Sequence, residues 1–208
     1  DNQALTIDKM YDFVFSENSL FIDEGRNLLI TEFGKNYGTY FSILSEIANG
    51  HYTQGEIESA LGGTAIGGYL SKLENVYNLI TRERPIFAKP GTKKNVRYII
   101  GDNFLNFWFK YIERNRSYIE LQNFDDLRQL AKADYPTYSG RVLEKYFKQK
   151  LAETGGFKEI GSWWETKSSI GKQRINSYEI DIVALKSSGK KALIAEVKRV
   201  PENNDSHT

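Results

Sequence analysis

Two carboxylates and a lysine near the end of the chain have the types and spacing for divalent-metal chemistry. Asp181 lies in one apolar, β-branched run, and Glu196-Val197-Lys198 ends the next one. The polar segment 186–191 between the two runs predicts a hairpin with a tight turn at Ser188-Gly189. That turn places Asp181 opposite Glu196, and Lys198 on the same face of the strand. Opposed carboxylates repel each other, and a hard cation between them converts the repulsion into ligation. We therefore expect a Mg²⁺ or Mn²⁺ site on this hairpin. The alternative is an ion pair of Lys198 with Asp181 or Glu196 on a solvated face.

The composition narrows the class of protein that must position these side chains. The chain has 208 residues, 40% of them hydrophobic, which allows one large or two small domains. It contains no cysteine and only two histidines, so disulfides, cysteine–histidine zinc sites and most histidine-based triads are excluded. The formal net charge of +1 gives no overall bias towards nucleic acid. No apolar run has the length of a membrane span, so we expect a cytoplasmic protein without membrane contact.

Residues 39–100 predict a winged helix-turn-helix. A helical stripe comes first, and Thr53-Gln54-Gly55-Glu56 then forms a capping box at the start of a second helix. Thr64 is placed to cap a third helix. Two strand-like runs follow, 79–88 and 96–100. Three short helices and a β-hairpin are the element order of this DNA-binding fold.

Basic side chains gather on the predicted wing and on the third helix. The positions that could contact nucleic acid are Lys72, Arg82, Arg84, Lys89, Lys93, Lys94 and Arg97. Contacts from the wing would go to DNA phosphates and carry no sequence information. The third helix lacks the Arg, Asn or Gln near its start that base recognition uses. A protein-docking or structural role for this domain therefore stays open.

The remaining segments predict a helical connector and a second domain. Residues 101–135 start at Gly101-Asp102-Asn103 and carry an aromatic stripe, which helical spacing favours as core rather than as a base-stacking surface. Tyr135-Pro136 is expected to end the helix and mark a domain boundary. Residues 136–208 predict a helix that carries Glu144, followed by three strands. The expected fold class is α+β, with an α/β second domain built on a mixed sheet.

This second domain resembles the restriction-endonuclease-like superfamily. The hallmark of that superfamily is an Asp followed after a gap by Glu/Asp-x-Lys, matched here by Asp181 and by Glu196-Val197-Lys198. Ile180 stands where the superfamily has proline. The resemblance implies that Asp181 and Glu196 ligate Mg²⁺ and that Lys198 orients the attacking water. It also implies that Glu144 holds metal or water.

The whole chain is similar to the C-terminal part of archaeal and bacterial P-loop (AAA-type) ATPases, in which a winged helix precedes a nuclease-like domain of unknown function. The segments that carry this likeness are 43–50, 98–111, 140–144 and 179–184. No G-x-x-x-x-G-K-[ST] motif is present, so we expect no nucleotide site in this chain and a missing N-terminal ATPase domain. Residues 1–38 would then be a remnant of the ATPase lid or linker, and 136–208 a truncated nuclease-like domain.

Three hypotheses follow for the function. The first is the C-terminal fragment of a DNA-associated ATPase, with Mg²⁺-dependent phosphodiester hydrolysis. The second is a non-catalytic DNA- or protein-docking module with a degenerate nuclease fold, and the third is a scaffold for protein partners. A homo-oligomer also stays open, because the aromatic stripe could cover a second subunit. Convergence of Glu144, Asp181, Glu196 and Lys198 on one point would favour the enzyme.

Overall fold

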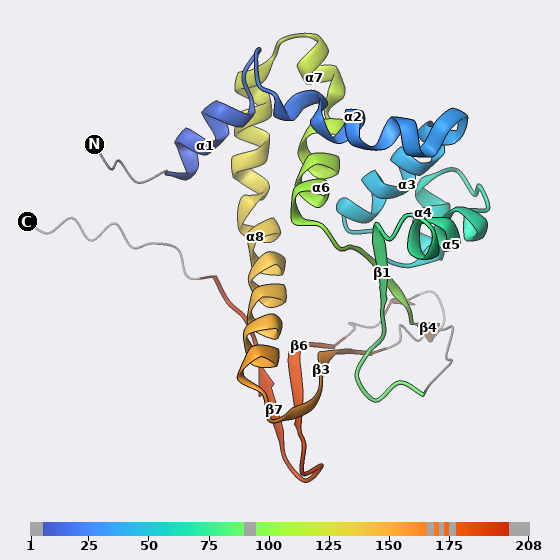
Figure 1. Ribbon diagram of the computed structural model, residues 1–208, viewed down its shortest axis with the longest axis vertical. Coiled ribbons are helices and arrows are strands. Elements are labelled where there is room, and N and C mark those ends of the chain that lie inside the picture. Colours follow the sequence, from blue (N-terminus) through green and yellow to red (C-terminus); the bar gives the residue numbers. More distant parts are fainter. Residues whose placement is uncertain (1–5, 90–94, 166–168, 171–172, 175–177, 200–208) are drawn as a thin grey trace, which may run out of the picture. The chain divides into compact units, whose positions relative to one another are not determined.

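The computed structural model describes residues 6–89, 95–165, 169–170, 173–174 and 178–199 (Figure 1). The chain divides into two compact units. The helical unit consists of Asp1–Glu83 and Val96–Ala133, and the sheet unit consists of Arg84–Asn95 and Asp134–Thr208. The division does not follow chain order, because the segment between the first two strands belongs to the sheet unit.

The helical unit is built mostly from short helices. In chain order its elements are α1 (Ile7–Val14), α2 (Phe21–Phe33), η1 (Gly34–Asn36), α3 (Tyr37–Ala48), α4 (Gln54–Ala60), α5 (Gly67–Asn75), β1 (Ile80–Glu83), β2 (Arg97–Ile100), α6 (Asn103–Phe107), the π-helical η2 (Trp108–Glu113), α7 (Arg116–Glu120) and the first part of α8 (Phe124–Thr154). β1 and β2 form an antiparallel pair in which Ile80 faces Ile100. Three helices followed by this pair reproduce the element order expected for residues 39–100.

The opening of the chain is more ordered than its sequence pattern indicated. The Thr6 hydroxyl caps α1 by accepting the Lys9 backbone N–H, and α2 follows after a short turn. Tyr11 and Phe15 are completely buried, and their rings stack at 5.8 Å between centroids. Aromatic residues four positions apart lie on one side of a helix, so burial organises a segment that has no long periodic pattern.

Two predicted helix starts are confirmed. At α4 the Thr53 hydroxyl accepts the Glu56 N–H at 3.3 Å, and the Glu56 carboxylate accepts the Thr53 N–H at 3.1 Å. At α6 the Asp102 carboxylate accepts the Leu105 N–H at 2.8 Å. Both caps depend only on neighbours in sequence, which makes them legible without a structure.

The predicted cap at Thr64 is wrong. α5 begins at Gly67, and its N-cap residue is Ile66. The Thr64 hydroxyl instead donates to the Leu61 carbonyl, and the Glu58 carboxylate of α4 accepts the Ile66 N–H at 3.2 Å. A side chain from the preceding helix therefore satisfies a backbone donor that local capping would otherwise serve.

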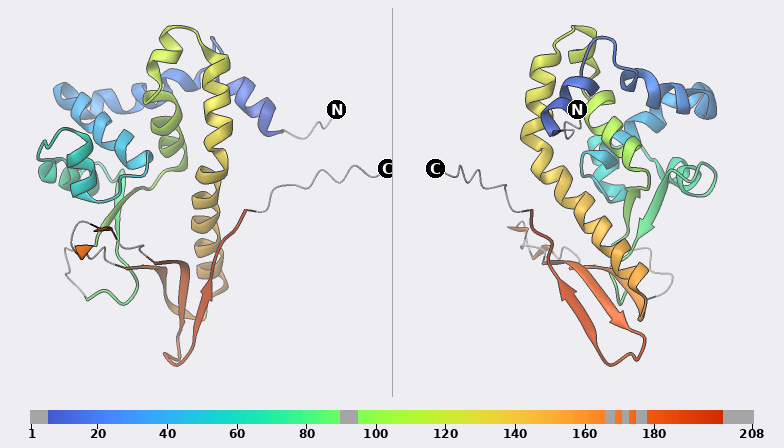
Figure 2. Two further views of the ribbon diagram at one scale, coloured as in Figure 1. Left: turned by 180° about the vertical axis from the view of Figure 1, so that it is seen from behind. Right: turned by 60° about the vertical axis from the view of Figure 1, so that its left-hand side comes forward.

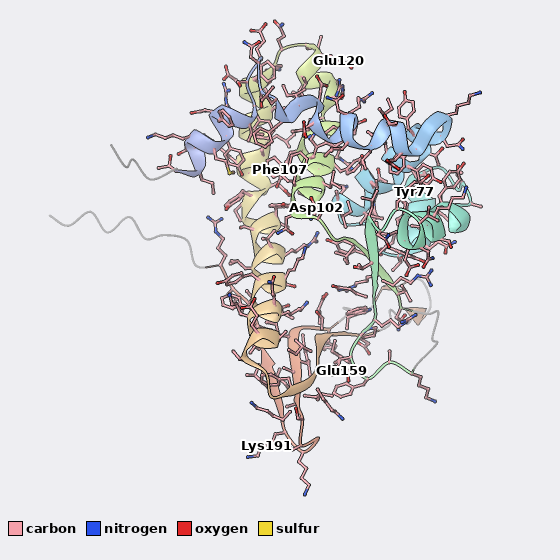
Figure 3. All side chains as sticks on the ribbon, in the orientation of Figure 1. Tyr77, Asp102, Phe107, Glu120, Glu159 and Lys191 are labelled. Atoms are coloured by element: carbon pink, nitrogen blue, oxygen red, sulfur yellow. The ribbon has the colours of Figure 1, made fainter. Side chains whose placement is uncertain are left out.

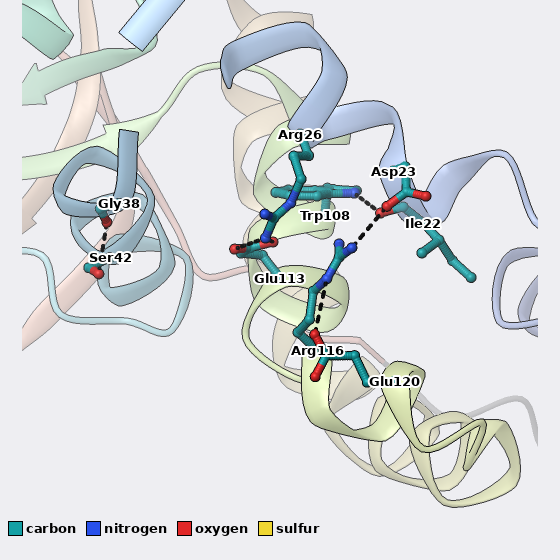
Figure 4. A network of polar contacts seen from close by, with 9 residues as sticks. All are labelled: Ile22, Asp23, Arg26, Gly38, Ser42, Trp108, Glu113, Arg116 and Glu120. Atoms are coloured by element: carbon teal, nitrogen blue, oxygen red, sulfur yellow. Dashed lines mark hydrogen bonds and ion pairs between the residues drawn. The ribbon is translucent and has the colours of Figure 1, made fainter. Parts of the chain in front are cut away.

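The aromatic stripe after Asp102 forms the core of the helical unit, as expected. Trp108, Tyr111 and Ile112 are at most 1% exposed, and the rings of Trp108 and Phe109 both meet the Phe41 ring edge-on. The Trp108 indole N–H donates to the carbonyls of Phe21 at 2.9 Å and Ile22 at 3.2 Å. Figure 4 shows the bond to Ile22, together with nearby ion pairs on α2, η2 and α7.

The helix α8 continues through Pro136, so the predicted helix break at Tyr135-Pro136 is wrong. Figures 1 and 2 show α8 as one unbroken helix. Proline removes one backbone donor and crowds the preceding turn. Leu127 and Ala131 are fully buried in the first part of the helix, and the Ser139 hydroxyl donates to the Pro136 carbonyl. None of the helices within the described ranges combines the length and apolarity needed to cross a bilayer.

The sheet unit contains β3 (Phe157–Trp164), β6 (Glu179–Lys186) and β7 (Ala192–Ala195) in the order β3-β6-β7. Two further short strands, β4 (Ser169–Ile170) and β5 (Gln173–Arg174), pair with each other. The expected fold class α+β is confirmed, but the sheet is not mixed, because all the strand pairs in the described residues are antiparallel. Parallel neighbours need a crossover of a dozen or more residues, usually a helix, and β6 and β7 are joined by a short turn.

Candidate active site

The predicted β6–β7 hairpin forms with the expected register. Ile182 pairs with Ala195 and Leu185 with Ala192, which is the register of a turn at Ser188-Gly189. Figure 3 shows Lys191 at the tip of this hairpin. β7 ends at Ala195, so Glu196 lies one position past the paired residues. If the pairing continued by one residue, Asp181 would lie opposite Glu196, but the last hydrogen-bonded pair is Ile182 with Ala195.

Beyond the last β6–β7 pair, a hydrogen bond from the Val197 backbone N–H to the Asp181 carboxylate replaces a backbone–backbone bond between the strands. The Oδ2 atom of Asp181 accepts this N–H at 2.8 Å. This contact fixes the side chain against the strand exit and uses one carboxylate oxygen. The other oxygen, Oδ1, is not used in this bond and can serve as a ligand atom.

Asp181 also sits at a β-bulge. Gly161 pairs with Val183 and Trp163 with Ile180, so Asp181 and Ile182 together face the single residue Ser162. The bulge removes the Asp181 carbonyl from the regular ladder, and the Ser162 hydroxyl donates to that carbonyl at 2.9 Å. Bulges re-aim side chains and occur frequently beside active sites.

Glu144 on α8 is the second carboxylate of the site. The pKa of Glu144 is raised from 4.5 to about 7, first by burial and then by the negative charge of Asp181. Lys148 and Arg141 oppose this rise, and Glu179 adds to it. The half-buried Glu144 carboxylate has neither a hydrogen bond nor an ion pair with any residue in the described part of the chain. A desolvated carboxylate without a hydrogen bond is costly for the fold and typical of functional sites.

Lys148 was not predicted from the sequence, yet it belongs to this group. Its ammonium donates to the hydroxyl of Ser162, a residue that is 7% exposed. The sequence does contain one signal, because Lys148 lies four positions after Glu144 and so shares its helix face. Ser162 carries no such signal, since its place depends on the bulge.

Glu196 and Lys198 lie apart from the buried pair. Their side chains form an ion pair at 3.0 Å and are 62% and 80% exposed, respectively. No group of three acidic or histidine side chains suited to a metal ion occurs among the residues that the structure describes. The structure therefore places Glu144 and Asp181 close enough for their charges to interact, and leaves Glu196 and Lys198 paired in solvent.

Several of the predicted basic positions already have protein partners. Arg82 pairs with Glu74 of α5 and lies over the Tyr98 ring at 5.7 Å, and Arg97 faces Glu83 across the β1–β2 pair. Arg84, Lys72 and Lys89 are exposed. Lys93 and Lys94 lie outside the described residues.

The loop that was predicted as the wing packs within the sheet unit. The Ile86 N–H donates to the Ser162 carbonyl at 2.8 Å, and the Ile86 side chain is 4% exposed. Phe87, its neighbour, is 65% exposed. The loop thus adds one backbone bond to β3 at the residue that anchors Lys148.

Comparison with known proteins finds similarity to archaeal and bacterial sequences. Residues 108–207 match the model of DUF234, a family described as archaeal and bacterial proteins of unknown function. The chain is similar to the uncharacterized protein MJECL04 of Methanocaldococcus jannaschii, with 40% identity over 169 residues. The match covers 77% of this chain and 35% of that protein, so the chain spans about a third of the relative's length. No solved structure matches the chain.

Proposed function

We propose that the sheet unit hydrolyses phosphodiester bonds of DNA with Mg²⁺, and that Glu144 and Asp181 hold the metal. The observation that carries the proposal is the half-buried Glu144 carboxylate: it forms no hydrogen bond or ion pair with any described residue, and the charge of Asp181 acts on it more strongly than those of Lys148 and Arg141. Burial and the neighbouring negative charge both oppose its ionisation, and a cation between the two carboxylates reverses both effects.

The donor set fits Mg²⁺. This ion is commonly held by one or two carboxylates, with waters and substrate phosphate oxygens completing an octahedron. Asp181 offers the oxygen that Val197 does not use, and Glu144 offers both of its oxygens. When bound, Mg²⁺ supplies a water of lowered pKa and offsets charge on the transferring phosphoryl group. Glu196 and Lys198 would join the site only after their ion pair opens.

The finer architecture belongs to the same proposal. α3, α4, α5 and the β1–β2 pair are interpreted as a winged helix, and the sheet unit as a restriction-endonuclease-like domain. The element order and the helix Glu144 with the strand Asp181 support this interpretation. We further propose that the parent protein is a DNA-associated ATPase whose nucleotide-binding part lies outside this chain. The length of the relative from Methanocaldococcus jannaschii, about three times the matched span, leaves room for it.

Calorimetry with Mn²⁺ and Mg²⁺ tests the metal site, and incubation with labelled duplex DNA tests cleavage. The Glu144→Gln and Asp181→Asn variants keep the shape of each side chain, and the amide oxygen introduced by Asp181→Asn could still accept the Val197 N–H. Each variant should lose at least tenfold in metal affinity and all measurable cleavage, because one ligand charge is gone.

The matched control for this experiment is Glu153→Gln, on the same helix. Glu153 is exposed and paired with Lys150, so its loss should leave metal binding and cleavage unchanged. An unmodified chain that binds neither ion would remove the basis of the proposal. Equal losses in all three variants would show a general destabilisation rather than a metal site.

A non-catalytic DNA- or protein-docking module is the second candidate function. The exposed Glu196–Lys198 pair favours it, because those two side chains are not gathered with Glu144 and Asp181. In this case DNA binding should persist in EDTA and depend on exposed Lys72 and Lys89. Arg82→Ala should matter less, since Glu74 already holds that guanidinium. Metal-dependent cleavage that Asp181→Asn abolishes would exclude the module.

A further inference from the structure

We propose that Lys148, rather than Lys198, is the lysine that contacts the phosphate of a nucleic acid bound beside Glu144 and Asp181. The proposal rests on the proposed function, because it names the residue that binds the substrate's charge at that site. The contacts of the two lysines, their exposure and their remaining hydrogen-bond donors carry the argument.

Lys148 is anchored to the strand that carries Asp181. Its ammonium donates to the Ser162 hydroxyl, and that hydroxyl donates its own proton to the Asp181 carbonyl at 2.9 Å. Because the single proton of Ser162 is used on Asp181, its oxygen can only accept from the lysine. The buried serine thereby couples the position of the ammonium to the backbone of the acidic strand.

The ammonium still has donors for a ligand. A lysine ammonium has three N–H donors, and Ser162 is the hydrogen-bond partner of Lys148 found among the described residues. Two donors therefore remain for phosphate oxygens. Lys148 lies one helical turn after Glu144. The carboxylates can hold a cation while the ammonium meets the anionic oxygens of a phosphodiester, and this division of charge is what phosphoryl transfer requires.

Lys198 is held in place less firmly than Lys148. It follows the end of β7, its side chain is 80% exposed, and its partner in the structure is the similarly solvated Glu196. Exposed ion pairs contribute little stability and hold two long side chains loosely. A group that must meet a phosphate at a fixed place is better supplied by an anchored side chain.

Binding of a short fluorescein-labelled DNA duplex, followed by anisotropy, tests the proposal on the whole chain. Ca²⁺ replaces Mg²⁺, so that the duplex is held without being cut. Lys148→Met should weaken binding about tenfold and lower the salt slope by about one contact, the effect expected when one phosphate contact is removed. Lys148→Arg keeps the charge and should restore most of the affinity. Lys198→Met should change the affinity less than twofold.

Two further variants guard against a purely structural explanation. Lys150→Met removes a positive charge from the same helix, where Lys150 pairs with exposed Glu153, and should leave binding unchanged. Ser162→Ala leaves the Lys148 charge in place but removes its anchor, and should weaken binding several-fold. If Lys148→Met does not fold, Ser162→Ala and Lys148→Arg decide the matter, and full affinity in Ser162→Ala overturns the proposal.

Each remaining outcome is also decisive. A loss in Lys198→Met without a loss in Lys148→Met assigns the role to Lys198 and overturns the proposal, as do equal effects or no effect in both variants. An unmodified chain that binds no duplex overturns the proposed function together with this inference. An unmodified chain that cleaves DNA, with unchanged binding and cleavage in Lys148→Met, overturns the inference alone.

Discussion

At the scale of single residues, the Trp108 ring leaves no room for a side chain at Gly25. A Cβ atom on Gly25 would lie 2.3 Å from the indole ring, which is completely buried and hydrogen-bonded to the α2 backbone. Neither the ring nor the helix backbone can move away cheaply. We therefore expect Gly25→Ala to lower the free energy of unfolding by about 2–4 kcal/mol, measured by urea denaturation.

A second helical glycine provides the control. Gly38 lies in α3, and a Cβ atom there would meet no heavy atom within 4 Å. Alanine is the better helix former by about 0.5–1 kcal/mol, so Gly38→Ala should be neutral or stabilising. A small effect of Gly25→Ala, comparable with that of Gly38→Ala, would contradict the packing around Trp108.

Glu144 makes the stability of the protein depend on pH. Its folded pKa of about 7 lies above the ordinary value of 4.5, so the folded state holds the proton more tightly. The stabilisation of the folded state by protonated Glu144 is complete below pH 4.5 and is lost as the pH rises through about 7. The negative charges of Asp181 and Glu179 raise this pKa further, and the positive charges of Lys148 and Arg141 lower it.

Glu144→Gln should therefore abolish the decrease in stability that accompanies ionisation of Glu144. Above the folded pKa the variant should be more stable than the unmodified chain by about 1–2 kcal/mol, after allowance for solvent screening. Urea denaturation across the pH range measures the difference, and Glu153→Gln should leave the profile unchanged. A variant that is less stable than the unmodified chain at high pH would show that Glu144 is paired when ionised.

The sequence identified some residues of the site and missed others for a physical reason. Asp181 was found because hairpin register follows from turn composition, and Glu144 because it stands at the helix position where the resembled superfamily often has a glutamate. Ser162 and Lys148 were missed because their contact depends on the bulge opposite Ser162. A bulge shifts side chains by one place, and the marker for it in β3 is Gly161, because an isolated glycine inside a strand often indicates a bulge without showing which partner residue it displaces.

At the scale of elements, prediction succeeded where the cause is local and failed where it is tertiary. The capping box at Thr53 and the cap at Asp102 involve residues three positions apart, and both form. The break expected at Pro136 does not occur, and α8 continues from Phe124 to Thr154. Leu127 and Ala131 of this helix are fully buried, and tertiary contacts of this kind can exceed a local preference of a few kcal/mol.

The cost of Pro136 remains measurable. Pro136→Ala restores a backbone donor and relieves the crowding in the preceding turn, so it should raise the thermal stability, by about 1–3 kcal/mol at the midpoint. Thr137→Ala, at the exposed neighbouring position, should change stability by only a few tenths of a kcal/mol. A loss of stability in Pro136→Ala would show that α8 needs the proline for its local geometry.

At the scale of the whole molecule, the two units are interleaved along the chain. Residues 84–95 belong to the sheet unit although β1 and β2, on either side, belong to the helical unit. The sequence predicted residues 84–88 as the end of a strand and 89–95 as the connection of a basic wing, but β1 ends at Glu83. The backbone bond and burial of Ile86 join it to β3, and such long-range contacts leave no periodic pattern.

Ile86 and Phe87 are neighbours in this loop, but Ile86 is buried and Phe87 is exposed. Ile86→Ala removes buried methyl groups beside Gly161 and should destabilise the sheet unit by about 2–4 kcal/mol. Phe87 has a φ of 73° and is 65% exposed, so Phe87→Gly should be neutral or stabilising, because it relieves a strained backbone and costs little packing. Hydrogen exchange of the β3 amides reports on the sheet unit directly. Faster exchange in Ile86→Ala but not in Phe87→Gly would establish the loop as part of that unit. Unchanged exchange in both variants would show that the loop does not stabilise the sheet unit and would favour a wing exposed to solvent.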